Sequence, residues 1–380
     1  MGCTASLKKF VFPAVSFLVS ASFIQNIFAL EAKIGILLSF TGSQAYYGKE
    51  TKNGIDLALE QHNKNNKDLK IKLFVEDSQS SPSEAARGIN KLITSDKVVV
   101  VIGDMVSSNT IAAGSIAEKS KIPILSPGST NDTVTIGKNY IYRTCFTDSF
   151  QGLVMANFAY KNLNAKTAVI LQDSDSDYSI GLSKNFSDKF TLDGGKVTKI
   201  LRYSQKDTNF TSQLGEIRKL KPDVVFIPGF HQQVGVILRE SKDLQINSKM
   251  LGGDGWDTQE LRTIAKGAEN GGFISNHYSA ESKDPTLQSF VKAYKAKYNI
   301  EPSSFSALGY DSANIVLEAI KKANSNEPEK INKAIANTKN LNAATGVITI
   351  DKNHNASKPA VILEFTPKGY KYITSVNPNN

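Results

Sequence analysis

Cysteine is scarce in this sequence, whose 380 residues include only two, Cys3 and Cys145. Two cysteines form at most one disulfide, so the chain is neither a small disulfide-stapled scaffold nor a multi-cysteine zinc protein. A chain of this length can bury a large core without such staples, and the length is typical of two domains. We expect Cys145 to be a small buried hydrophobic side chain and not a reactive thiol.

Signatures of catalysis and of metal binding are also missing. The sequence contains no G-x-x-x-x-G-K-[ST], no H-E-x-x-H and no G-x-S-x-G motif. The run Asp173–Asp177 resembles the start of a calcium loop, but Tyr178 stands where glycine is required and Lys184 where glutamate is required. The four histidines are widely separated. We therefore predict no enzyme activity, no cofactor and no metal site.

Basic residues outnumber acidic ones, with 45 Lys and Arg against 36 Asp and Glu and a formal net charge of +9. They are scattered over polar helix faces such as Lys292–Lys297. No arginine-rich arm and no aromatic RNA-binding motif accompanies them. We therefore expect no nucleic-acid partner.

The first thirty residues differ in composition from the rest of the chain. Two lysines precede the apolar stretch Phe10–Ile24, and the small residue Ala29 follows it. This order is typical of a secretory signal peptide, and the apolar part is shorter than the roughly 20 residues of a membrane span. We predict a signal peptide over residues 1–29, cleaved near Ala29; an uncleaved anchor is the alternative. Cys3 precedes the basic residues, so we expect no lipid anchor.

Short apolar runs alternate with longer amphipathic stretches along the remaining chain. The run Val98–Ile102 is apolar on both faces, which is typical of a parallel strand covered on two sides. Repeated strand–helix–strand alternation indicates an α/β fold with right-handed crossovers. The expected strands are Lys33–Leu38, Leu69–Val75, Val98–Gly103, Ile122–Ser126, Thr167–Gln172, Lys196–Tyr203, Asp223–Pro228, Met250–Gly252, Gly272–His277, Gly346–Ile350, Val361–Phe365 and Tyr370–Ser375. The expected helices are Lys49–Asn63, Ser83–Thr94, Asn109–Ser120, Phe150–Asn162, Ile180–Leu192, Thr208–Leu220, Gln233–Leu244, Pro285–Tyr298 and Phe305–Ala323.

The alternation restarts after a break near Arg143–Asp148, and no low-complexity linker separates the two series. We therefore predict two doubly wound lobes with a chain that crosses between them several times. Lobe 1 is expected to comprise residues 30–147 and 278–361, and lobe 2 residues 148–277 and 362–380. Open α/β sheets bind ligands beyond the carboxyl ends of their strands, so we expect a ligand between the lobes.

Two of the expected strand-end loops, Asp104–Thr110 and Ser126–Asp132, are rich in small polar residues. Ser and Asn before a helix are also ordinary N-caps, which is the structural alternative. Free backbone N–H groups, hydroxyls and a helix dipole could together hold a small anion. Neither loop contains Lys or Arg, which favours a carboxylate over a phosphate.

Several short motifs, taken in order, resemble the periplasmic leucine/isoleucine/valine-binding proteins. The matching segments are Ile34–Gly42, Tyr46–Gly48, Val101–Ser108, Ile124–Thr130, Tyr142–Asp148 and Gly252–Trp256. The resemblance implies an α/β type I periplasmic binding protein, with two Rossmann-like lobes joined by a hinge of three crossovers. It further implies a periplasmic location, a small amino-acid ligand and the membrane permease of an ABC transporter as partner. We expect a monomer.

The resemblance also implies roles for individual residues. Ser107 and Thr130 fall where the family holds the ligand carboxylate, and the Gly128 carbonyl falls where it receives the amine. Asp254 falls where an acid neutralises that amine, and Tyr178 matches a tyrosine that the second lobe contributes on closure. The aromatic residues expected around the ligand are Tyr47, Phe230 and Tyr310.

Two positions depart from the leucine-type members. Phe230 stands where those members carry a tyrosine whose hydroxyl helps to hold the amine, and Asp254 is one methylene shorter than their glutamate. Simple packing is the alternative role for Tyr47 and Tyr310. The predicted function is capture of a branched-chain or similar apolar amino acid. A binding protein for an amide, urea or small organic acid, a ligand sensor, and an exported hydrolase are the alternatives.

Overall fold

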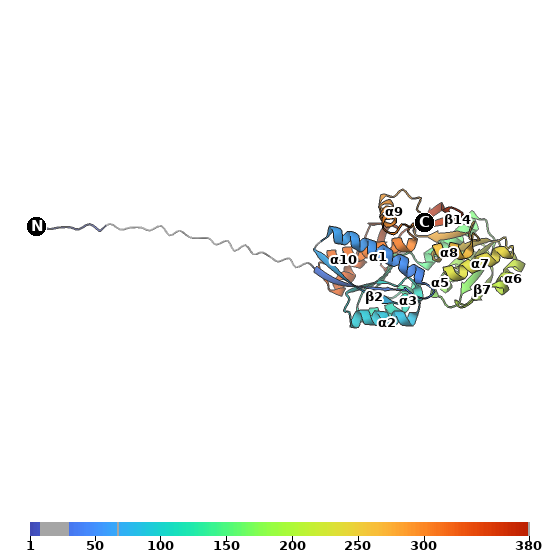
Figure 1. The fold of residues 1–380 in the computed structure, drawn as a ribbon, viewed down its shortest axis with the longest axis horizontal. Coiled ribbons are helices and arrows are strands. Elements are labelled where there is room, and N and C mark those ends of the chain that lie inside the picture. Colours follow the sequence, from blue (N-terminus) through green and yellow to red (C-terminus); the bar gives the residue numbers. More distant parts are fainter. Residues whose placement is uncertain (8–29, 67, 379–380) are drawn as a thin grey trace.

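A computed structural model describes residues 1–7, 30–66 and 68–378 and has two lobes (Figure 1). Helices α1, α2, α3 and α10 surround the sheet of the first lobe, and α5 to α8 surround that of the second. The expected signal peptide and its cleavage point lie largely outside the described residues. In the described part of the chain, no helix is both long and apolar enough to cross a membrane.

The first lobe is built on a five-stranded sheet in which all neighbouring strands are parallel. Its order, β2-β1-β3-β4-β5, is that of a doubly wound fold whose winding reverses between β1 and β3. The strands are β1 (Leu30–Leu38), β2 (Leu69–Asp77), β3 (Val100–Gly103), β4 (Ile124–Ser126) and β5 (Ile141–Arg143). The helices are α1 (Ala45–Asn65) and α10 (Ser304–Ala323) on one face, and α2 (Pro82–Thr94) and α3 (Ser107–Ser120) on the other.

The second lobe repeats this order in the parallel part of a seven-stranded sheet, β15-β14-β10-β9-β8-β6-β7, to which β14 and β15 add antiparallel strands. The strands are β6 (Thr167–Asp173), β7 (Lys196–Tyr203), β8 (Val224–Phe226), β9 (Lys249–Gly252), β10 (Phe273–Asn276), β14 (Ala360–Thr366) and β15 (Gly369–Val376). Its helices are α4 (Asp148–Asn157) and α5 (Asp177–Leu192) on one face, and α6 (Thr211–Leu220), α7 (His231–Asp243) and α8 (Gln259–Ala265) on the other.

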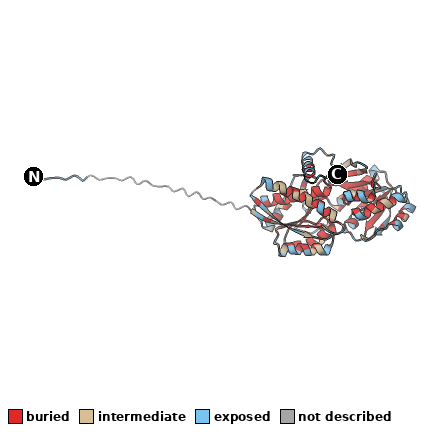
Figure 2. Cartoon of the chain, in the orientation of Figure 1, coloured by how far each residue is buried: buried red, intermediate tan, exposed pale blue. Residues whose placement is uncertain are grey.

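The remaining elements complete the first lobe after the chain has returned to it. They are α9 (Pro285–Tyr298), α11 (Pro328–Ala336) and a small sheet of β11 (Leu341–Ala343), β12 (Gly346–Ile350) and β13 (Ala356–Ser357). Figure 2 shows buried residues concentrated in the sheets and on the helix faces that cover them, with exposed residues on the outer faces. Each sheet is therefore sandwiched between two helix layers, which confirms the predicted α/β fold of two doubly wound lobes.

The chain passes between the lobes at residues 144–147, 277–284 and 358–359. Cys145 lies in the first crossover, and it is buried as predicted, with burial raising the pKa of its thiol to about 12. Because β14 begins at Ala360, the expected boundary between residues 361 and 362 falls inside that strand. We correct the boundary to Lys358–Pro359.

The differences from the expected elements concern short or weakly patterned segments. Strand β5 has three residues, and its parallel pairing with β4 makes it a strand of the first sheet. The short helices α8 and α11 were also missed. A π-helical turn at Phe158–Asn162 replaces the last part of the helix expected over Phe150–Asn162. Segments of this length carry too few residues for hydrophobic periodicity to identify them.

Helices α1 and α10 approach each other closely at Gly54. A Cβ atom added there would lie 1.8 Å from the Ser306 carbonyl oxygen and 2.8 Å from the Tyr310 backbone nitrogen. Only glycine therefore allows the two backbones to pack at this separation.

We expect Gly54→Ala to lower the free energy of unfolding by about 1–3 kcal/mol, the range for overpacking a filled interior. Denaturant unfolding monitored by circular dichroism measures the change. Gly215→Ala is the matched control, because Gly215 lies in α6 and an added Cβ meets no atom within 4 Å. That control should be stabilising by about 0.4–1 kcal/mol. Equal effects of the two substitutions would contradict the explanation.

Candidate functional site

A narrow cavity lies between the two lobes, beyond the carboxyl ends of their strands. The loops after β3 and β4 and the starts of α1, α3 and α10 line it from the first lobe, and the start of α5 and the segments after β8 and β9 line it from the second. The lining residues are Tyr47, Met105, Val106, Ser107, Gly128, Tyr178, Phe230, Asp254, Gly255 and Phe305.

One end of the cavity is formed by the start of α3. This helix begins at Ser107 without a capping side chain, since the preceding Val106 has no side-chain acceptor. The first N–H groups of a helix have no partner within it and form the positive end of the helix dipole. The Asp104 carboxylate fixes the turn by accepting from the Val106 N–H at 3.0 Å and from Asn109 Nδ2 at 3.1 Å. The N-terminal end of α3 thus presents fixed backbone N–H donors that are suited to an anion.

The loop after β4 adds further polar groups at the same end. Ser107 Oγ accepts from the Asn131 N–H at 3.2 Å, so its own proton is free to donate. The Thr130 hydroxyl is buried and has no hydrogen-bond partner among the described residues. The buried Arg143 guanidinium donates to the carbonyls of Ser129 at 2.8 Å and Asn131 at 2.9 Å. Arg143 therefore holds this loop in place and adds positive charge behind it.

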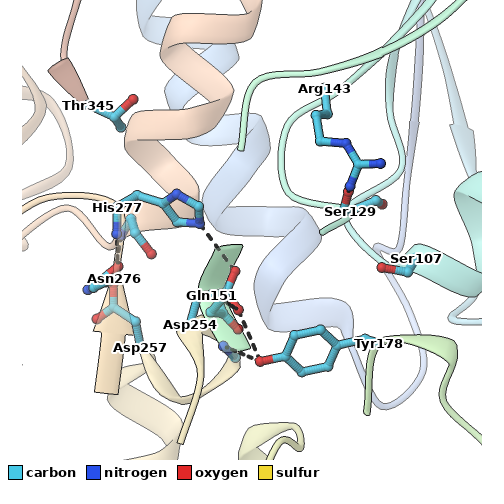
Figure 3. Close-up of polar contacts among 12 residues, drawn as sticks. Ser107, Ser129, Arg143, Gln151, Tyr178, Asp254, Asp257, Asn276, His277 and Thr345 are labelled. Atoms are coloured by element: carbon cyan, nitrogen blue, oxygen red, sulfur yellow. Dashed lines mark hydrogen bonds and ion pairs between the residues drawn. The ribbon is translucent and has the colours of Figure 1, made fainter. Parts of the chain in front are cut away.

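Asp254 provides a negative charge at the second-lobe side of the cavity, where its side chain is almost completely buried. Figure 3 shows its three contacts: Oδ1 accepts from Gln151 Nε2 at 2.9 Å and from the Tyr178 hydroxyl at 3.0 Å, and Oδ2 lies 3.2 Å from His277 Nε2. Burial lowers the pKa of His277 to about 4, so the imidazole is neutral at pH 7 and donates through Nε2. An ionised carboxylate accepts about four hydrogen bonds, so one acceptor position is left for a ligand.

Aromatic side chains form the wall between the two polar ends. The Tyr47 ring centroid lies 4.8 Å from that of Phe305 and 5.5 Å from that of Phe230. The Tyr47 hydroxyl donates to the Gly255 carbonyl at 2.7 Å and accepts from the His231 N–H at 3.0 Å. Burial raises the pKa of Tyr47 well above its ordinary value, so this hydroxyl keeps its proton. Tyr47 is therefore both part of the wall and a bridge between the lobes.

The structure brings most of the expected site residues to this one cavity. Those that line it are Tyr47, Ser107, Gly128, Tyr178, Phe230 and Asp254. Thr130 is buried beside them but does not line the cavity; the Asp148 carboxyl comes close to its hydroxyl without hydrogen-bond geometry. The placement of Tyr310 in the pocket wall was wrong. Its hydroxyl donates to Gln61 Oε1 at 2.7 Å, and its ring packs 4.9 Å from that of Phe290, away from the cavity.

Several residues of the site were missed in the sequence. Met105 and Val106 directly precede Ser107 in a loop already singled out, so their position was a usable signal. Phe305 lines the cavity from the start of α10, where the sequence offers no motif. Gln151 and His277 touch Asp254 from other elements, and no local pattern marks them.

Comparison with known proteins agrees with this geometry. The family model described as periplasmic binding protein matches residues 31–370. The Leu/Ile/Val-binding protein BraC3 of Rhizobium johnstonii is 30% identical over 322 residues, which are 83% of this chain and 86% of that protein.

Two solved structures share the fold closely. The leucine-binding protein LivK of Thermotoga maritima is 36% identical, with a TM-score of 0.88 over 92% of this chain and 99% of that one. The branched-chain amino acid transporter substrate-binding protein LivJ of Streptococcus pneumoniae, solved with isoleucine, is 30% identical, with a TM-score of 0.87 over 92% of this chain and 100% of that one. The chain therefore belongs to the periplasmic binding protein family, a family of solute-binding proteins, as its motifs predicted.

Proposed function

We propose that this protein captures a small amino acid with an apolar, branched side chain and delivers it to the permease of an ABC transporter. The observation that carries the proposal is the cavity itself. It has hydrogen-bond donors and a helix N-terminus at one end, a buried carboxylate at the other and aromatic rings between them. These three features match the carboxylate, the ammonium group and the side chain of a zwitterionic amino acid.

At the carboxylate end, we assign two kinds of donor: the free hydroxyl proton of Ser107, and the backbone N–H groups at the start of α3. Thr130, which is buried beside the cavity with the Asp148 carboxyl close to its hydroxyl, would offer a second hydroxyl donor. The Gly128 carbonyl would accept from the ligand amine.

At the amine end, we assign Asp254 as the counter-charge, with Tyr178 closing beside it. A carboxylate in contact only with uncharged donors keeps its negative charge available for a cation. Phe230 contributes an apolar ring and no hydrogen bond, so the amine would depend mainly on Asp254. An organic acid without an amine would leave Asp254 unpaired in the closed cavity, which argues against that alternative.

The side chain of the ligand would pack against Tyr47, Phe230 and Phe305, with Met105 completing the contact. Aromatic and thioether side chains favour an apolar group over a charged one. Two similar structures support a branched-chain ligand: one is named a leucine-binding protein, and the other was solved in complex with isoleucine.

The proposed mechanism is capture by closure, without catalysis. The ligand would dock on the first lobe, and bending at the three crossovers would bring Tyr178, Phe230 and Asp254 onto it. Closure would also create the surface that the transporter recognises. We propose a monomer without a nucleic-acid partner, exported by a signal peptide at residues 1–29.

A thermal-shift panel tests the ligand class, because a ligand that binds only the native state raises its apparent stability. The panel contains the twenty amino acids, small amides, urea and small organic acids. We expect leucine, isoleucine and valine to give the largest increases in Tm, and charged amino acids none. A larger increase with 4-methylpentanoate, benzoate or an amide would instead favour the alternative ligand classes.

A further inference from the structure

His277 contacts the acid of the candidate site without lining the cavity. Its Nε2 lies 3.2 Å from Asp254 Oδ2, whereas both other donors, Gln151 and Tyr178, reach Oδ1 (Figure 3). Among the described residues, His277 thus provides the one hydrogen bond that the structure has on Oδ2. The orientation of the Asp254 carboxylate therefore depends on His277 at Oδ2 and on Gln151 and Tyr178 at Oδ1.

The imidazole is held rigidly at the hinge. His277 is the first residue after β10 and begins the second crossover, and its side chain is fully buried. Its ring stacks on Phe146 of the first crossover, with centroids 3.9 Å apart and planes inclined by 21°. Its Nδ1 has no hydrogen-bond partner among the described residues, so the proton belongs on Nε2, facing Asp254.

We infer that His277 is a positioning residue for the amine of the ligand, acting through Asp254. As a neutral donor, the His277 imidazole fixes the position of Asp254 Oδ2 and hydrogen-bonds one lone pair of that oxygen. It does so without cancelling the negative charge of the carboxylate. A cation at this position would compete with the ligand ammonium, and an apolar side chain would leave Oδ2 a buried, unsatisfied acceptor. The inference rests on the proposed function, since it requires a ligand with an amine.

The test compares leucine with its des-amino analogue 4-methylpentanoate by titration calorimetry at pH 7.5. In His277→Leu we expect leucine to bind about 10- to 100-fold more weakly, the scale for losing a hydrogen bond to a charged group. Binding of 4-methylpentanoate, which has no amine, should change by less than about threefold. His277→Gln keeps an amide donor at a similar reach and should restore most of the leucine affinity.

His354→Leu is the matched control. His354 also stacks on an aromatic ring, that of Tyr142 with centroids 4.2 Å apart, and it touches a backbone carbonyl, but it does not contact Asp254. It should leave both affinities unchanged. Equal losses for the two ligands in His277→Leu, or an unchanged or stronger affinity for leucine, would overturn the inference. A wild type that binds both ligands equally would refute the proposed function itself.

Discussion

Asp254→Asn is expected to weaken leucine binding by about 2–4 kcal/mol, which is roughly a 30- to 1,000-fold rise in Kd. The substitution removes the negative charge at nearly constant volume. In the closed cavity the ligand ammonium then loses its counter-charge while it remains shielded from water, which is costly. Phe230 offers no hydrogen bond to compensate, so the loss should be close to the full value.

Calorimetry with leucine and 4-methylpentanoate on wild type and variant measures this effect. The variant should bind 4-methylpentanoate at least as well as wild type, because no amine is lost. Asp257→Asn is the matched control: Asp257 is buried nearby but does not line the cavity, and it accepts from Asn276 Nδ2 and the Ser304 N–H. An unchanged leucine affinity in Asp254→Asn would show that no amine is held there and would favour an amide or organic acid as ligand.

The free energy of unfolding is expected to fall as the pH is lowered from 6.5 towards 4, in part because of His277. Burial lowers its pKa from the ordinary 6.5 to about 4 in the folded protein. Between these two pH values the unfolded chain binds a proton on this imidazole that the folded chain does not. The contribution of His277 to the free energy of unfolding is therefore present above pH 6.5 and is lost as the pH falls towards 4. The loss at pH 4.5 is about 2.5 kcal/mol for one such imidazole. His231 is likewise buried, and burial lowers its pKa to about 4, but the Glu260 carboxylate lies 2.9 Å from its Nε2 and favours the charged imidazole, so its contribution is smaller.

Urea unfolding of wild type, His277→Gln and His231→Gln at pH 7.5 and at pH 4.5 measures this contribution. His277→Gln should show a smaller difference between the two pH values than wild type, by about 2.5 kcal/mol, and His231→Gln should show a smaller reduction because Glu260 favours the charged His231. Burial raises the pKa of Asp104 and Asp311, which opposes the effect as the pH falls. These acids are shared by all three proteins, so their contribution cancels in the comparison. An identical pH dependence in variants and wild type would contradict the assignment.

The sequence carried enough local information to predict the fold class and much of the cavity. Runs such as Val98–Ile102, apolar on both faces, are typical of parallel strands covered by two helix layers, and Val100–Gly103 is such a strand in the structure. In such folds the loops at the carboxyl ends of the strands meet at the ligand site, so the loops that hold Ser107 and Gly128 were expected there, and the family resemblance added Phe230 and Asp254. The rule that ligands bind at these ends requires parallel strands, and the alternation of strands and helices along the chain indicates such strands.

What the sequence left open, the tertiary structure decided. Phe305 and Tyr310 are five residues apart on α10, which is about 1.4 turns, so their side chains point in different directions. The packing of α10 against α1 turns Phe305 to the cavity and Tyr310 to Gln61. His277 and Gln151 reach Asp254 because β9 and β10 are adjacent in the sheet and α4 packs against β10, which brings three separate segments together. Contacts between segments that are far apart in the chain cannot be read from hydrophobic periodicity, because the pattern around each residue reports only on the helix or strand in which that residue lies.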